Sequence, residues 1–590
     1  MSKRPWHRLP TLFALIKLAQ FRRTLRQQNL HDTSKLPTKG QTPIPTPSSD
    51  KSHLSFRTAD GGFNDLDTPE MGMAGTRFGR NVPVKETDPD EANLMIPNPR
   101  VISRKVMTRD EFRPASSLNV MAAAWIQFQN HGWFNHGDNQ PDNKFDIPLE
   151  KDDPWPKEHR PMEVGKTIVD PTRPEGDTAN PPTFINTLSH WWDGSQIYGS
   201  DQATLDKLRS HVDGKMRLDD QGLLPLDEAN SIDTTGFNDN YWVGLSLLHT
   251  LFVKEHNTLC DHLKQHYPDW TDHELFGHAR LINAALMAKI HTVEWTPGIL
   301  GHPALQVSMN ANWWGILGKH VKTMYGRISD SEALSGIVGS PTDHHTAPYY
   351  LTEEFVAVYR LHPLIPDDFN VYSVKDGHLR KATNFFEVSG KRTRALVEEI
   401  GLPDLFYSLG IANPGAITLH NYPRFLQQLV RDNGEVLDLA AVDILRDRER
   451  GVPRYNRFRE LIGRGRVKSF EEITSNPVWA QELRQIYNND LDSVDLMVGM
   501  FAEDLPAGFG FSDTAFRIFI LMASRRLKSD RFFTKDYRAE IYTQFGLDWI
   551  NNNSMLDVLR RHHPELQFTL RGVNNAFAPW KNLWRNVVGR

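Results

Sequence analysis

The segment EEFVAVYRLHPLIPDDF, residues 353–369, places Tyr359 three positions before His362. Residues three apart share one face of a helix, so the phenol and the imidazole are expected to point the same way. A neutral imidazole is a common ligand of haem iron, and a nearby phenol is a natural one-electron donor to an oxidised haem. The spacing alone is also compatible with two ordinary buried side chains, so the other motifs of the chain decide between the interpretations.

The composition of the 590-residue chain is that of an ordinary globular protein, with 39% hydrophobic residues, 24% charged residues and a formal net charge of -5. This balance argues against a nucleic-acid partner, which usually requires a strongly basic domain. The single cysteine, Cys260, excludes an internal disulfide framework and a CxxC metal site. It is compatible with a reducing compartment, so we expect a cytoplasmic location.

No run of about 18 or more apolar residues occurs, so no transmembrane helix is expected. The N-terminus combines apolar residues near helical spacing with many basic residues and has no acidic residue before Asp32. The apolar residues are Leu9, Leu12, Phe13, Ile16 and Leu25, and the basic ones are Lys3, Arg4, Arg8, Lys17, Arg22, Arg23 and Arg26. This pattern indicates either an interfacial helix on anionic lipid, and so a peripheral membrane contact, or a helix packed on the body with a solvated basic face.

The distribution of proline, glycine and polar residues divides the chain into two parts. Residues 33 to about 100 are rich in Pro, Gly, Thr, Ser and Asp, which favours an irregular arm, and residues 136–182 form a second irregular stretch. Helical patterns dominate elsewhere, at residues 118–131, 242–266, 273–295, 353–361 and 512–527. We therefore predict a mainly α protein, with an N-terminal amphipathic helix and irregular arm over residues 1–100 and one large α-helical catalytic domain over residues 101–590.

A second histidine motif lies in AAAWIQFQNH, residues 122–131, which reads as a mostly apolar helix. Gln127 and His131 are one turn apart and project to one side. A histidine can move the proton of a peroxide because it titrates near neutral pH, and Gln127 could hydrogen-bond the same ligand. His131 could equally be a satisfied core histidine, and His136 is a rival for the same role.

Further motifs, in order along the chain, resemble the animal-type haem peroxidase superfamily, which includes the cyclooxygenases. They are the Q-x-x-x-H pattern of residues 127–131, LHTLFVKEHN at 248–257, YRLHP at 359–363, RDRERGVPRYN at 446–456 and RLKSDRF at 526–532. The resemblance implies a largely α-helical single catalytic domain with haem b buried at its centre.

Within that superfamily the chain is most similar to the fatty-acid α-dioxygenases known from plants. The similarity runs over nearly the whole chain, through PWHRLP (5–10), FGRNVP (78–83), WWDGSQIYGS (191–200), AKIHTVEWT (288–296), ANWWGILGK (311–319) and MASRRLKSDRFFT (522–534). It implies a haem-dependent dioxygenase, activated by hydrogen peroxide, in which a tyrosyl radical abstracts a Cα hydrogen from a long-chain fatty acid and O2 adds to give a 2-hydroperoxy fatty acid. A haem peroxidase acting on small reductants is the alternative.

The resemblance also assigns roles around the haem. His362 matches the proximal ligand, His131 the distal histidine and Tyr359 the radical tyrosine. Asp443 occupies the place of a polar residue beside the proximal imidazole, where a carboxylate would hold the ring and raise its basicity. A charge on the surface of a helix is the alternative for Asp443.

Three residues match the group that grips the substrate carboxylate in the dioxygenases: His291, Thr296 and Arg526. Charge-assisted bonds from such groups fix a carboxylate and would place Cα at the tyrosyl oxygen. The neighbouring Arg525 could replace Arg526 if the alignment shifts by one residue. An ordinary structural ion pair is the alternative role of Arg526.

Two segments depart from the superfamily pattern. Residues 189–195 resemble the calcium loop of the superfamily, because oxygens of Ser189, Trp191, Asp193 and Ser195 could face one ion. The position directly after the distal histidine, where relatives have an acidic residue, is Gly132 here. Calcium is therefore a candidate ligand, and a plain turn is the alternative. The segment 236–240 lacks the arginine that relatives carry on the distal side, so we expect a poor general peroxidase.

Overall fold

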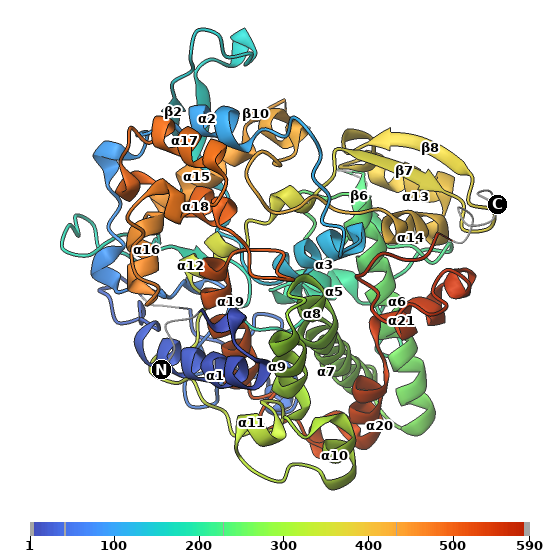
Figure 1. Ribbon diagram of the computed structural model, residues 1–590. Helices are drawn as coiled ribbons and strands as arrows, with labels where there is room; N and C mark the ends of the chain where they lie inside the picture. The colour runs from blue at the N-terminus through green and yellow to red at the C-terminus, as the bar shows by residue number, and fades with distance from the viewer. Residues whose placement is uncertain (1–4, 41–42, 228, 230, 432–433, 583–590) are drawn as a thin grey trace.

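The computed structural model describes residues 5–40, 43–227, 229, 231–431 and 434–582 and is built mainly from helices (Figure 1). The α-helices are α1 (Thr11–Gln28), α2 (Pro99–Ile102), α3 (Val120–Asn130), α4 (Ser195–Tyr198), α5 (Gln202–Leu208), α6 (Val243–His266), α7 (Asp272–Ile290), α8 (Thr296–Ile299), α9 (Pro303–Trp314), α10 (Gly318–Tyr325), α11 (Glu332–Ser335), α12 (Glu353–Val358), α13 (Arg392–Ile400), α14 (Leu402–Ile411), α15 (Leu439–Glu449), α16 (Tyr455–Leu461), α17 (Pro477–Ile486), α18 (Leu496–Ala502), α19 (Asp513–Ser529), α20 (Ala539–Asn552) and α21 (Met555–His562). The helices predicted over residues 118–131, 242–266 and 512–527 agree with α3, α6 and α19 to within two residues at each end.

Every sheet in the described ranges is an antiparallel pair of strands. The strands are β1 (Thr76–Arg77), β2 (Asn139–Ile147), β3 (Met162–Thr167), β4 (Ile185–Asn186), β5 (Leu226–Asp227), β6 (Ile232–Asp233), β7 (Asp368–Tyr372), β8 (Leu379–Asn384), β9 (Leu429–Val430) and β10 (Val436–Leu437), paired β1–β4, β2–β3, β5–β6, β7–β8 and β9–β10. The prediction of a mainly α protein is therefore confirmed. The segment 136–182, however, contains the β2–β3 pair, which the sequence did not indicate because most side chains of β2 are exposed and leave no apolar alternation.

Two long helices form the centre of the fold. α7 packs against α6 and α20, and α3 packs against α6. α6 is buried at every position from Val243 to Val253, as expected for a helix surrounded by others. α7 begins with a capping box between Thr271 and Glu274, which satisfies backbone donors that the first helical turn leaves free.

The single helix predicted over residues 273–295 is interrupted. α7 ends at Ile290, a π-helical turn spans His291–Trp295, and α8 begins at Thr296. Single π turns inside helices occur frequently at functional sites. This turn changes the direction in which the side chains of residues 291–296 leave the helix, and helical periodicity alone does not predict it.

The helix predicted over residues 353–361 is shorter than expected. α12 ends at Val358, Tyr359 is its C-cap with φ −93° and ψ 12°, and His362 begins a separate 3-10 turn, His362–Leu364. Pro363 has no N–H to donate to an α-helix, which accounts for the early end. The shared-face argument for Tyr359 and His362 is therefore wrong, although the two residues stay neighbours in the chain.

The N-terminal segment packs on the body of the protein. α1 contacts α9 and α19, and Trp6, Leu18 and Leu25 belong to the same hydrophobic core as the central helices. The indole N–H of Trp6 donates to Asp513 Oδ1 at 2.9 Å. The boundary at residue 100 stays a prediction, because side chains on both sides of it share this core.

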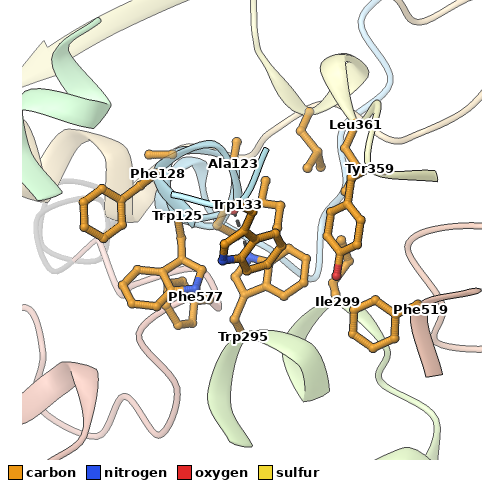
Figure 2. Packing of buried hydrophobic residues seen from close by; sticks show 14 of the residues in the cluster. Ala123, Trp125, Phe128, Trp133, Trp295, Ile299, Tyr359, Leu361, Phe519 and Phe577 are labelled. Carbon is orange, nitrogen blue, oxygen red and sulfur yellow. Dashed lines mark hydrogen bonds between the residues drawn. The ribbon is translucent and has the colours of Figure 1, made fainter. Parts of the chain in front are cut away.

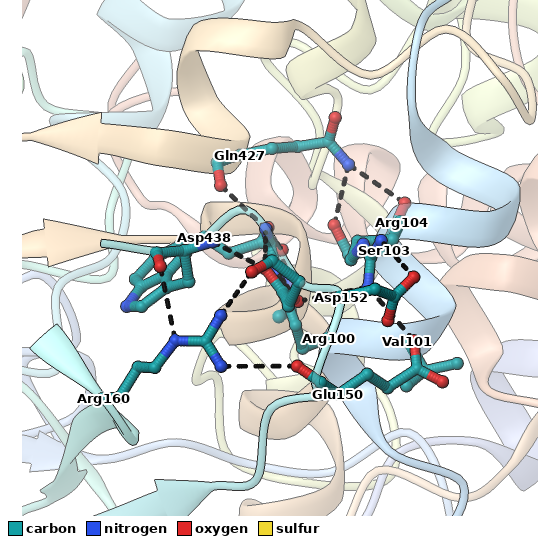
Figure 3. A network of polar contacts seen from close by, with 12 residues as sticks. Arg100, Val101, Ser103, Arg104, Glu150, Asp152, Arg160, Gln427 and Asp438 are labelled. Carbon is teal, nitrogen blue, oxygen red and sulfur yellow. Dashed lines mark hydrogen bonds and ion pairs between the residues drawn. The ribbon is translucent and has the colours of Figure 1, made fainter. Parts of the chain in front are cut away.

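A buried polar network fixes the start of α15 (Figure 3). The guanidinium of Arg100 contacts Asp438 at 2.7 Å and Asp153 at 3.0 Å, and it also donates to the backbone oxygen of Gln427. Asp438 caps α15 by accepting the backbone N–H of Ala441. The network therefore ties the segment that precedes the β2–β3 pair to the helix that carries Asp443.

No helix in the described part of the chain is long and apolar enough to cross a bilayer.

Candidate active site

His362 lies beside a buried carboxylate. Its Nδ1 is 2.8 Å from Oδ2 of Asp443, whose carboxylate also contacts Arg360 at 2.6 Å and accepts a hydrogen bond from the Tyr422 hydroxyl at 2.9 Å. Burial raises the pKa of Asp443, but His362 and Arg360 outweigh it, so the pKa lies below its ordinary value. Asp443 is therefore a buried, ionised group that orients the imidazole, and not a charge on the surface of a helix.

The second ring nitrogen of His362 is available for a ligand. Its Nε2 has no hydrogen-bond partner among the residues that the structure describes, and 33% of the side chain is exposed. A carboxylate facing Nδ1 favours a proton there and leaves the lone pair on Nε2. This residue could therefore hold a haem iron.

His131 is buried at the C-terminal end of α3. Gln127 Nε2 lies 3.5 Å from His131 Nε2, and Gln127 Oε1 accepts a hydrogen bond from Trp242 at 2.8 Å. Burial lowers the pKa of His131 to about 4, so the ring is neutral near pH 7 and can accept a proton. The ring of Phe237 contacts His131 edge-on, with centroids 5.1 Å apart, in the segment where a distal arginine is missing.

His136, the alternative to His131 as the distal histidine, forms its contacts elsewhere in the protein. Its Nε2 lies 3.0 Å from Glu353, and its ring stacks on Phe78 at 4.4 Å. Burial and the neighbouring Arg450 lower the pKa of His136 to about 4 although Glu353 raises it. Its polar contacts are satisfied within the protein, so it is the weaker candidate.

The phenol of Tyr359 is buried among aromatic rings (Figure 2). Its centroid lies 5.4 Å from Trp133, in an edge-on contact, and 6.1 Å from Phe519. The hydroxyl points toward the side of Phe519 in Figure 2 and has no hydrogen-bond partner among the described residues. Burial raises the pKa of Tyr359 far above its ordinary value, so the phenol is protonated at any physiological pH.

Arg526 is a fully buried cation without a carboxylate partner among the residues described. Its guanidinium lies 4.2 Å from the centroid of Trp133 and 4.9 Å from that of Trp192. One nitrogen donates to the backbone oxygen of Trp191 at 3.3 Å, while Nε and Nη1 have no partner. A buried charge is costly unless it is paired, so this arrangement favours an anionic ligand over the structural ion pair that was the alternative.

Arg525 differs from Arg526 although the two are adjacent. Its guanidinium donates to the backbone oxygens of Ala347 at 2.6 Å, Pro348 at 2.7 Å and His344 at 3.3 Å. These contacts hold a loop against α19. Arg526 is therefore the better candidate for binding a carboxylate.

His291 presents a hydrogen-bond donor to the same space. Its Nδ1 accepts the indole N–H of Trp125 at 3.2 Å, and because an indole only donates, the proton of the neutral ring lies on Nε2. That Nε2 has no partner in the described chain. Burial, followed by Arg526, lowers the pKa of His291 well below its ordinary value, so the ring stays neutral.

Two tryptophans bring these groups together. Trp133 contacts Tyr359, Arg526 and His291, the last at 5.3 Å, and Trp192 contacts His291 at 5.1 Å. Neither tryptophan was predicted to belong to the site. The only signal in the sequence was their position, two residues after His131 and inside the WWDG segment.

Thr296 lies at the start of α8, and its hydroxyl donates to the backbone oxygen of His291 at 2.8 Å. It lines a small cavity together with His291. Its proton is engaged with the backbone, so Thr296 would have to rotate its hydroxyl to donate to a ligand.

The loop at residues 189–195 has few groups free for a cation. Ser189 Oγ accepts the backbone N–H of Trp191, Ser195 Oγ donates to the backbone oxygen of Gly132, and the carboxylate of Asp193 lies 3.5 Å from Arg280. No cluster of three His, Cys, Asp or Glu side chains suited to a metal occurs in the described ranges. The donor set therefore fits calcium poorly, since the guanidinium already supplies the positive charge.

Gly132 leaves no space for the missing acid. A side-chain carbon there would lie 2.1 Å from Oε1 of Gln196, which could move, but also 2.9 Å from the backbone nitrogen of Gln196, which is closer than real contacts come. The glycine is therefore required by the packing of Gln196 against this turn.

Comparison with known proteins agrees with this fold and geometry. A family model described as animal haem peroxidase matches residues 56–575. The chain therefore belongs to the animal haem peroxidase family and, as this membership implies, binds haem.

Within that family the chain groups with the alpha-dioxygenases and is an oxidoreductase of the dioxygenase type. It is 38% identical to alpha-dioxygenase PIOX of Pisum sativum, over 98% of this chain and 89% of that protein. A crystal structure of fatty acid alpha-dioxygenase from Arabidopsis thaliana matches with a TM-score of 0.88 and 36% identity, covering 98% of this chain and 90% of that one. An Oryza sativa fatty acid alpha-dioxygenase variant solved with palmitic acid matches with a TM-score of 0.88 and 35% identity, covering 98% and 95%. The resemblance stated from the motifs is confirmed.

Proposed function

We propose that this protein oxygenates long-chain fatty acids at Cα. The observation that carries the proposal is the buried guanidinium of Arg526, which has no carboxylate partner among the described residues. Trp133 contacts both this guanidinium and the ring of Tyr359, whose hydroxyl also has no partner there. A carboxylate is the ligand that such a cation lacks. With the carboxylate held there, the carbon next to it faces the phenol.

The proposed roles follow from the contacts of each residue. His362 would hold the iron of haem b through Nε2, with Asp443 fixing the ring, and His131 would take the proton of hydrogen peroxide with Gln127 beside it. When bound and activated by peroxide, the haem supplies the one-electron oxidation of Tyr359. His291 Nε2–H and Arg526 bind the substrate carboxylate, and Thr296 completes the clamp if its hydroxyl rotates.

The reaction then needs only Tyr359, substrate and O2. The phenoxyl radical of Tyr359 takes a hydrogen atom from Cα and returns to the phenol, which leaves a carbon radical. O2 adds to that carbon, and the resulting peroxyl radical takes the phenolic hydrogen back. The product is a 2-hydroperoxy fatty acid, and the phenoxyl radical is regenerated.

A general peroxidase acting on small reductants is the less favoured function. The segment at residues 236–240 contains no arginine, and Phe237 packs on His131 instead. Tyr359 and Arg526 are both buried, which suits a substrate bound inside the protein more than a reductant at the surface.

The decisive experiment is incubation of the purified holoenzyme with palmitate in an oxygen electrode, followed by mass analysis of the product. Oxygen uptake with a product 32 mass units heavier, or the aldehyde one carbon shorter that it forms on losing CO2 and water, is the expected result. If the protein oxidised phenols with peroxide but consumed no O2 in the presence of palmitate, the peroxidase alternative would be favoured.

We also propose a peripheral contact with a bilayer on the cytoplasmic side. α1 packs through Ala14, Leu18 and Leu25, yet Leu12, Phe13 and Ile16 at its start are 65%, 59% and 48% exposed. This combines the two alternatives left open by the sequence, because one face packs on the body while the other could reach lipid.

A second group of exposed apolar side chains lies on and just after α10, which packs on α9 as α1 does (Figure 1). Met324, Tyr325 and Ile328 are each more than half exposed, and Lys319 on the same helix is exposed. Apolar groups beside cations suit an anionic lipid surface. Sedimentation with phosphatidylserine vesicles should pellet the protein, and Phe13→Ser with Ile16→Ser should leave it in the supernatant; equal pelleting of both proteins would refute the contact.

Calcium in the 189–195 loop is opposed by Arg280. We infer that this guanidinium takes the cation's place beside Asp193. Addition of calcium or of EGTA should then leave the melting temperature unchanged, whereas a rise with calcium would show that the loop binds the ion.

A further inference from the structure

The space beside the carboxylate clamp is nearly closed. A cavity of about 10 Å³ is lined by His291 and Thr296, by Asn312 of α9, and by Phe519 and Ser524 of α19. A cavity of this size holds about one water molecule, whereas sites for organic ligands typically measure about 300–1,000 Å³. An acyl chain that runs from the clamp into this cavity must therefore separate some of these walls.

The walls differ in how firmly they are held. α19 is buried along nearly its whole length, and the π turn continues the central helix α7. α9, in contrast, lies near the surface, with Val307 40% exposed, and α1 covers part of it. α9 is therefore the wall that can yield.

Two arginines of α1 hold the cavity residues in place. Arg22 Nη1 donates to Asn312 Oδ1 at 2.7 Å, and Arg26 Nη2 donates to Ser524 Oγ at 3.2 Å. Glu332 of α11 joins both arginines, at 3.3 Å from Arg22 and 3.0 Å from Arg26. We call these five residues the latch.

The latch is charged and largely shielded from solvent. Burial raises the pKa of Glu332, but Arg26 and Arg22 outweigh it and bring the value to about 2. Burial lowers the pKa of Arg22 to about 10, so both partners are ionised at neutral pH. Glu332 thus keeps two adjacent cations together, and its loss would leave them to repel each other.

We propose that the latch determines which acyl chains the clamp accepts. The inference rests on the proposed function, because it takes the cavity beside His291 and Thr296 as the start of the acyl site. A long chain that enters this cavity must push α9 away from α1 and α19, which separates Asn312 from Arg22. A short acid stays near the clamp and leaves the latch closed.

Binding without turnover gives the cleanest test. In the Tyr359→Phe holoenzyme, which should turn nothing over, calorimetry measures the Kd of palmitate and of octanoate with and without Glu332→Gln. Replacing the Glu332 carboxylate by an amide weakens its contacts with Arg22, Arg26 and Lys528. The Kd of palmitate should then fall about three- to fivefold, because less free energy is needed to open the latch. The Kd of octanoate should stay unchanged.

Two further variants guard against a general loss of structure. Asn312→Leu removes the acceptor at the cavity wall and should change the palmitate Kd in the same direction as Glu332→Gln. Glu471→Gln breaks a more exposed ion pair with Arg484, between the 3-10 turn Phe470–Glu472 and α17 away from the cavity, and should change neither Kd.

The outcome is separable from that of the proposed function. Equal changes for both acids, or no change for either in Glu332→Gln and Asn312→Leu, would overturn the role of the latch while leaving Cα oxygenation untouched. Oxygen uptake by the Tyr359→Phe protein would instead overturn the proposed chemistry.

Discussion

Replacing Arg526 with methionine should weaken substrate binding without weakening the fold. The clamp loses a charge-assisted bond to the carboxylate, worth about 1.5–3 kcal/mol, which raises the apparent KM for palmitate roughly 10- to 100-fold. Stability responds differently. The cation–π contacts with Trp133 and Trp192, worth about 0.5–2 kcal/mol, are lost, but an unpaired buried charge that costs several kcal/mol is removed as well.

Oxygen-electrode kinetics and differential scanning calorimetry on the same holoenzyme measure the two effects. Arg525→Met is the matched control, because its guanidinium has three backbone acceptors that the variant would leave unsatisfied. We expect the control to melt earlier with an unchanged KM, and Arg526→Met to melt at or above the wild-type temperature with a raised KM. If Arg526→Met melted earlier and kept the wild-type KM, Arg526 would be a structural residue and the clamp would be refuted.

The remaining predictions concern the haem, the radical and the pH dependence of stability. His362→Ala should lose the Soret band or shift its position, and an unaltered spectrum would remove the assignment of the iron ligand. Tyr359→Phe should bind haem normally and consume no oxygen with palmitate; wild-type uptake would exclude Tyr359 as the hydrogen abstractor. His256 and His563, whose pKa values burial lowers to about 4 and about 3, stay neutral in the folded protein while histidines of the unfolded chain take up protons below about pH 6.5. The free energy of unfolding in urea should therefore be greatest above pH 6.5 and fall steadily from there toward pH 4. A flat profile over that interval would contradict the neutral state of these rings.

Much of this architecture could be predicted because the motifs are local and carry their chemistry in few residues. The apolar periodicity of residues 242–266 gave α6 to within one residue, and the Q-x-x-x-H spacing placed Gln127 and His131 on one helix. The exact ends near Tyr359 could not be predicted by periodicity, since Pro363 and the C-cap end α12 three residues earlier than expected.

The candidate site could be predicted only in part because it is assembled from distant segments. The choice between Arg525 and Arg526 depends on which guanidinium meets backbone oxygens near residue 347, and no local pattern encodes that contact. Trp133 meets both the clamp and Tyr359, and Trp192 meets the clamp, only after α3, the 189–195 loop and α19 have packed. The latch joins residues some three hundred positions apart, such as Arg22 and Asn312, so its existence is a property of the fold.

The π turn at His291–Trp295 constrains how this chain can change in length. Each residue of an α-helix turns the chain by about 100°, so deleting one residue there would restore a regular helix while rotating everything after it relative to α7. His291 and Thr296 would then no longer face the same cavity, although each side chain would be intact. In proteins derived from this sequence, insertions and deletions should be tolerated in the loops. The π turn should keep its length of five residues even where its side chains vary.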